Sequence, residues 1–178
     1  MTDLIWAIIS ALIVFIMFFC NRKVRLGSLI RQQFKVFTND KSKKISFWDL
    51  MCFLLFPIIL SAILIFALRI NLQDTVAETL TTVFSLIFTI LFGFATILMG
   101  KSESANRIEK KIIEETFVSI ISATVLSLIA TIMSICITVV SVDMVKKVFW
   151  CGTLSISFMI VMLILLIIKR SFVIYCSK

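Results

Sequence analysis

The feature that most constrains this chain is a set of five apolar runs, each long enough to cross a bilayer as a helix. The runs cover residues 4–20, 48–69, 80–100, 117–142 and 148–168. With 61% hydrophobic residues and a mean hydropathy of +1.13, the 178-residue chain has too little polar surface to coat a soluble globule. We therefore predict an all-α, polytopic helical membrane protein with one transmembrane domain over residues 1–178. Five spans are expected, or four if one run does not cross.

The segments between these runs give three further expectations. Run 4–20 has Asp3 in place of a basic leader and is interpreted as a retained span rather than a signal peptide. Pro57 lies well inside the second run, where it is expected to kink the helix, as a hinge or as a static bend. A polar loop at 70–79 and a tight turn at 143–147 are predicted to connect neighbouring spans.

Lysine and arginine are divided unevenly between the two sides of the predicted spans. Segments 21–47, 101–116 and 169–178 carry fifteen of the eighteen basic residues. The positive-inside rule places these segments in the cytoplasm, which gives an N-terminus outside and a C-terminus inside. The net charge of +8 is therefore a signal of topology, and direct nucleic-acid binding is not expected.

Two stripes of small, mostly hydroxylated residues follow one face of the third and fourth predicted spans. The members are Thr82, Ser85, Thr89, Gly93, Thr96 and Gly100 in the first stripe, and Thr124, Ser127, Thr131, Ser134, Thr138 and Ser141 in the second. Steps of three and four residues put each set on one side of a helix. In one interpretation the stripes let helices approach closely and exchange modest hydrogen bonds. In the other, stripes from several subunits line a narrow ion path. Both interpretations predict a homo-oligomer.

Two cytoplasmic segments are candidates for contact with lipid or a partner. Within 21–47, apolar residues recur at helical steps, while Arg25, Arg31 and Lys35 lie on the remaining arc. This pattern is typical of an amphipathic helix on an anionic leaflet, although a docking surface for a protein remains an alternative. Lys110 and Lys111 pair at i,i+4 with glutamates in a predicted extension of the fourth span, which is a second candidate contact.

The residues that usually carry chemistry are few. The chain has no histidine, and its five cysteines show no ligand-like spacing, so free thiols and no metal site are expected. No ionisable residue lies near the centre of a span, which disfavours a pump or proton-coupled carrier. We find no phosphate-binding, zincin or nucleophile-elbow motif. The sequence predicts a protein that is not an enzyme and has no cofactor.

In its size, its number of spans, its basic cytoplasmic side and its small extramembrane mass, the chain resembles the membrane subunits of bacterial anti-phage defence systems. The nearer likeness is to the Kiwa-type membrane protein, and the weaker one is to the Hailong-type membrane effector. The resemblance covers overall architecture and carries no motif. It implies a multi-pass homo-oligomer in the bacterial inner (plasma) membrane that senses membrane disturbance and anchors a cytosolic effector protein encoded nearby. The alternative is a pore-forming channel that depolarises the membrane when triggered.

Overall fold

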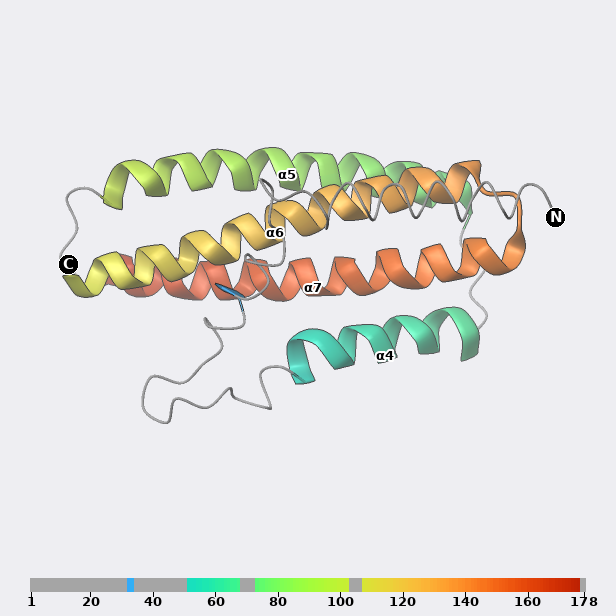
Figure 1. Ribbon diagram of the computed structural model, residues 1–178, viewed down its shortest axis with the longest axis horizontal. Coiled ribbons are helices and arrows are strands. Elements are labelled where there is room, and N and C mark those ends of the chain that lie inside the picture. Colours follow the sequence, from blue (N-terminus) through green and yellow to red (C-terminus); the bar gives the residue numbers. More distant parts are fainter. Residues whose placement is uncertain (1–31, 34–50, 68–72, 103–106, 177–178) are drawn as a thin grey trace.

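The computed structural model describes residues 32–33, 51–67, 73–102 and 107–176, and almost all of them are helical (Figure 1). The elements are η1 (Met51–Leu55), α4 (Phe56–Ala62), η2 (Ile63–Ala67), α5 (Asp74–Ser102), α6 (Arg107–Val139) and α7 (Asp143–Cys176). No strand occurs in these ranges, which confirms the all-α class. The predicted run 4–20 and most of segment 21–47 lie outside the described residues.

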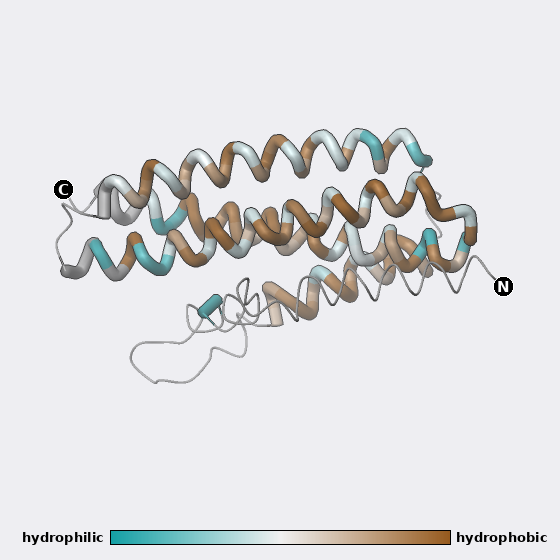
Figure 2. The backbone as a smooth tube through the Cα atoms, turned by 45° about the horizontal axis from the view of Figure 1, so that its top comes forward, coloured by the Kyte–Doolittle hydropathy of each residue, from teal (hydrophilic) through white to brown (hydrophobic). Residues whose placement is uncertain are grey.

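Three helices are long and apolar enough to cross a membrane. Their apolar parts are Asp74–Gly100 in α5, Ile112–Val139 in α6 and Asp143–Phe172 in α7. The segment Met51–Ala67 is apolar but shorter. The tube in Figure 2 is mostly brown through the helices, with hydrophilic residues nearer their ends. A helical protein with three membrane-length helices agrees with the fold class, whereas the count of five spans and their orientation stay predictions.

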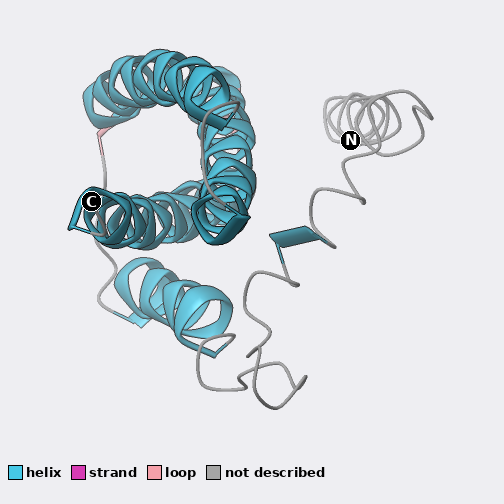
Figure 3. Ribbon diagram, turned by 90° about the vertical axis from the view of Figure 1, so that its left-hand side faces the viewer, coloured by secondary structure: helices cyan, strands magenta, loops and turns pink. Residues whose placement is uncertain are grey.

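The helices form an antiparallel bundle in which α6 is central. Helix α5 packs on α6, α6 packs on α7, and α4 packs on α7 (Figures 1 and 3). We call the end where α5 ends, α6 begins and α7 ends the inner end, after the predicted orientation. The opposite end, where α6 turns into α7 through residues 140–142, is the outer end.

The buried positions explain why these three helices pack together. On α5 the buried residues recur every seven positions, at Ala77, Phe84, Leu91 and Leu98. On α6 they recur at alternating steps of three and four. This α6 seam comprises Ile113, Thr116, Ile120, Ala123, Ser127, Ala130, Ser134 and Ile137. A seven-residue repeat keeps one narrow face of a helix against its neighbour, as in a left-handed coiled coil.

Pro57 lies at a change of helix type. Helix α4 begins at Phe56, with Pro57 in its first turn, and the wider π-helical turns η1 and η2 flank it. Proline has no N–H to donate to the preceding turn, so an uninterrupted α-helix is disfavoured here. The structure therefore resolves the predicted kink as a π-to-α junction.

Two predicted connections are shorter than the sequence indicated. Residues 74–79 of the predicted loop form the start of α5, and the predicted turn at 143–147 is the first turn of α7. Both predictions are wrong for these residues. Each of these helices carries an aspartate in its first turn, Asp74 and Asp143, where a negative charge is stabilised by the helix dipole. Polar composition alone suggested loops at positions where the acidic residues instead begin helices.

Candidate functional site

The stripe of small residues on α5 faces away from the bundle. All six positions, from Thr82 to Gly100, are exposed. A Cβ atom added at Gly93 or Gly100 would meet nothing within 4 Å, so no other element covers this side of the helix. We call this surface the α5 stripe. It is therefore available for contact with lipid or another chain.

The hydroxyls of the α5 stripe are bonded within their own helix. The Thr89 Oγ1 donates to the Ser85 carbonyl at 3.0 Å, and the Ser85 Oγ donates to the Thr81 carbonyl at 2.8 Å. Thr82 and Thr96 make the same type of bond four residues back, at 3.2 and 3.1 Å. Each oxygen keeps lone pairs that can accept a further hydrogen bond. The stripe therefore presents acceptors on a slim, otherwise apolar surface.

The stripe on α6 is split between the inside and the outside of the bundle. Ser127 and Ser134 are fully buried, whereas Thr138 and Ser141 are exposed at the outer end. Thr124 and Thr131 are half-buried and donate to carbonyls of their own helix, at 2.8 and 2.9 Å. The central part of this stripe is thus used for packing within one subunit.

The difference between the stripes follows from the α6 seam. Ser127 and Ser134 belong to both patterns, because the seam and the hydroxyl stripe share the same alternation of three and four residues. Ala123 and Ala130 continue the seam where the stripe diverges from it. Considering the alanines together with the serines would have located the buried face from sequence.

An ion pair that the sequence analysis missed joins α6 to α7 at the inner end. The Arg170 Nη2 lies 3.5 Å from the Glu115 Oε2, and the Arg170 Nη1 donates to the Ser119 Oγ at 3.4 Å. Ser119 is fully buried, and the Arg170 side chain is only 18% exposed. A largely buried arginine needs such partners. The sequence analysis had assigned Glu115 to the neighbouring lysines and Arg170 to the tail.

The hairpin register could have revealed this pair. Glu115 lies 27 residues before Val142, and Arg170 lies 28 residues after it. In an antiparallel helical hairpin that folds near Val142, these positions come to the same level. A second ion pair, Lys146 with Asp74, joins α7 to α5 at the outer end. Helix α7 is therefore tied by charge to both other helices, once at each end.

Segment 21–47 touches the bundle at one described residue. The Ser122 Oγ donates to the Gln33 Oε1 at 3.1 Å, and the Gln33 Nε2 is buried without a partner. The sequence analysis had placed Gln33 on the solvent-facing arc of an amphipathic helix. Its contact with α6 places this side chain against protein instead.

The remaining predicted contact residues are only partly accounted for. Lys110 is exposed near the start of α6. Arg25, Arg31 and Lys35 lie outside the described residues, and the side chain of Lys111 is not described. Cys52, Cys136 and Cys151 are free, as predicted for these three cysteines.

The fold thus has the character of a helical bundle with three helices that fit transmembrane helices. Comparison with protein-family models, with curated proteins and with solved structures finds no match to this chain.

Proposed function

We propose that this chain is a homo-oligomeric membrane subunit whose copies associate through the α5 stripe. The observation that carries the proposal is that all six small residues of that stripe are exposed, although the rest of α5 is built around a buried seven-residue repeat. Close packing between helices in lipid favours small residues at the contact.

The surface around the stripe has a shape that fits another helix. Large exposed side chains flank it on both sides, with Leu86, Ile90 and Ile97 on one flank and Phe92 and Met99 on the other. Their spacing at 100° per residue leaves the stripe as a shallow channel between two ridges. A helix from a second copy can seat its own ridge in that channel.

The biological role that we propose for this assembly is phage defence in the bacterial inner membrane. The assembly would sense membrane disturbance and anchor a cytosolic effector encoded nearby. Support comes from the architectural resemblance to Kiwa-type membrane subunits and from the exposed Lys110 at the inner end of α6. The slender described connections leave little mass for a separate sensing domain, which favours coupling through lipid or a partner.

A direct test of association is the mass of the particle extracted in a mild detergent. We expect a multiple of the 20.3 kDa subunit. A particle of one subunit at all protein concentrations would contradict the proposal. Recovery of cytosolic proteins by the wild type and by Lys110→Glu tests the anchoring role, since equal recovery would exclude this surface.

A pore is the second candidate, and one observation favours it. The α5 stripe exposes four hydroxyl groups whose hydrogens are donated within the helix, so that oxygen acceptors point outward. Several copies of α5 around an axis would line a path with these acceptors. Thr89→Leu should then lower the conductance in a planar bilayer, whereas Thr131→Leu on α6 should not. Equal currents from both variants and the wild type would exclude α5 as the pore lining.

A further inference from the structure

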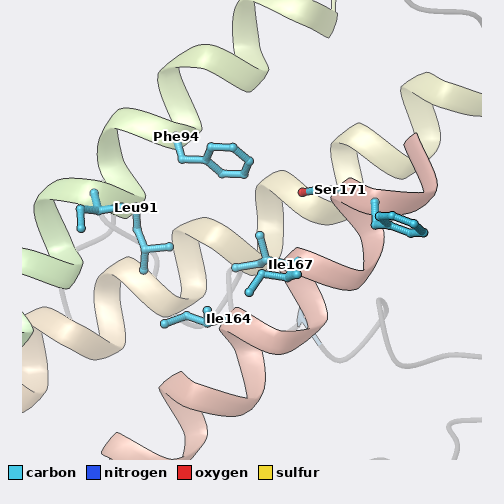
Figure 4. Close-up of a pocket in the computed structure, with 8 residues that line it drawn as sticks. Leu91, Phe94, Ile164, Ile167 and Ser171 are labelled. Carbon is cyan, nitrogen blue, oxygen red and sulfur yellow. The ribbon is translucent and has the colours of Figure 1, made fainter. Parts of the chain in front are cut away.

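A groove of about 420 Å³ lies between the inner halves of α5 and α7. Figure 4 shows Leu91 and Phe94 on α5, facing Ile164, Ile167 and Ser171 on α7, with α6 behind them. Every lining residue except Ser171 is apolar. The volume is within the range of sites that hold small ligands.

The groove exists because α5 and α7 both pack on α6 and not on each other. Leu91 and Ile167 belong to the same buried cluster and form the floor. Ile168 and Phe172 stand above it on α7 and are 59% and 65% exposed. The result is a slot that opens towards the surroundings of the bundle and is narrow because two helices border it.

The polar groups of this region gather at one end of the slot. Ser171 lines the inner end, and its Oγ is buried without a hydrogen-bond partner. The exposed Lys169 lies two residues away on α7. Arg170 is already paired with Glu115, which leaves Lys169 as the cation at this end of α7 that is free to meet a ligand. A molecule that fits must be apolar along its length and anionic at its inner end.

A second copy docked on the α5 stripe would not fill this slot. The stripe residues and the lining residues of α5 are entirely different, and helical spacing places Leu91 and Phe94 on another side of the helix. The slot therefore stays open to lipid in a monomer and in an oligomer built through the stripe.

We propose that the groove binds one acyl chain of an anionic phospholipid, whose headgroup lies at the inner end near Lys169 and Ser171. An acyl chain supplies the apolar length, and the phosphate supplies both the charge that Lys169 attracts and the acceptor that a serine hydroxyl can bind. The inference needs the membrane location but not self-association, so it stands even if the particle proves to be a single subunit.

The test uses the full chain in phosphatidylcholine vesicles that contain a phosphatidylglycerol with a diazirine along one acyl chain. After illumination, mass spectrometry locates the labelled residues. We expect the groove-lining residues to be labelled several-fold more than Met99, which is equally exposed but lies outside the groove. Ile168→Trp fills the slot and should reduce labelling to the level of Met99. Leu165→Trp, at a position 57% exposed on the same helix, is the matched control and should leave labelling unchanged.

The headgroup position is tested by competition. Unlabelled phosphatidylglycerol should displace the probe more strongly than phosphatidylcholine does, and Lys169→Ala should reduce this preference by about fivefold. Lys147→Ala, at the outer end, should not change it. Uniform labelling of groove and Met99, or equal effects of the two tryptophan variants, would overturn the acyl-chain site. Unchanged headgroup preference in Lys169→Ala would overturn the anionic headgroup, and cross-links from the groove to another copy would show a protein occupant instead.

Discussion

Two stripes with nearly the same composition and spacing have different environments in this molecule. On α5 every member of the stripe is exposed, whereas on α6 Ser127 and Ser134 are fully buried. The residue that completes the repeat makes the difference. Helix α6 adds alanines to its hydroxyls and buries that face, while α5 buries a separate face of large side chains. A small-residue stripe thus identifies a contact surface but does not tell which chain fills it.

The largest expected effect comes from adding bulk to the buried stripe. Ser127→Leu inserts a large side chain where the serine is fully buried, and overpacking of this kind costs about 1–3 kcal/mol. The thermal unfolding temperature in detergent should fall. Thr89→Leu on the exposed α5 stripe is the matched control and should change stability by less than about 0.5 kcal/mol. Similar losses in both variants would remove the distinction between the stripes.

The next effect concerns association, where the order of the two positions reverses. Thr89→Leu should weaken self-association by about 1 kcal/mol, or about fivefold in the dissociation constant, because the bulkier side chain keeps helices apart. Energy transfer between labelled copies at varied protein-to-lipid ratios measures this. Ile97→Leu, on the flank of the stripe, conserves volume and should associate like the wild type. A dissociation constant unaffected by Thr89→Leu would place the contact elsewhere.

The ion pair at the inner end offers a change that should affect only the inside of the subunit. Glu115→Gln and Arg170→Gln should each lower stability by about 1–3 kcal/mol, since each leaves a partly buried group with a poorer partner. The two losses should not add, and a double-mutant cycle should show coupling of about 0.5–2 kcal/mol. Strict additivity would mean that the pair contributes nothing. The α5 contact between copies should be unaltered in all three variants.

The smallest effect distinguishes two glycines. At Gly152 a Cβ atom would approach the Met133 Cε to 2.5 Å, but that methyl is the end of a flexible side chain and can move. Gly152→Ala should therefore lower stability by less than about 1 kcal/mol. At Gly93 the space is open, so Gly93→Ala should leave the unfolding temperature equal or slightly higher. A large loss at Gly93 would show that the α5 stripe is covered within the subunit.

Much of the fold could be predicted from the sequence, because long apolar runs in lipid leave few alternatives to helices. The runs at 80–100, 117–142 and 148–168 each lie largely within α5, α6 and α7. The helix starts were misjudged at Asp74 and Asp143, where polar residues were interpreted as loops.

The candidate site was harder to predict, since a stripe on one helix does not reveal its partner. The three-and-four spacing located both stripes but could not say that Ser127 faces its own subunit and Thr89 does not. The pairing of Glu115 with Arg170 depends on the register of the hairpin, and the slot beside Phe94 depends on two helices that diverge around a third. Both are properties of packing between segments distant in sequence.

The most direct test of the account is disulfide cross-linking in membranes, with single cysteines placed in a chain whose five native cysteines are replaced by alanine. Cysteines join only when their Cβ atoms come within about 4.5 Å. Thr89→Cys should give a cross-linked dimer on mild oxidation, and Ser127→Cys should stay monomeric. Dimers from Ser127→Cys, with none from Thr89→Cys, would contradict the assignment of α5 as the surface that joins copies.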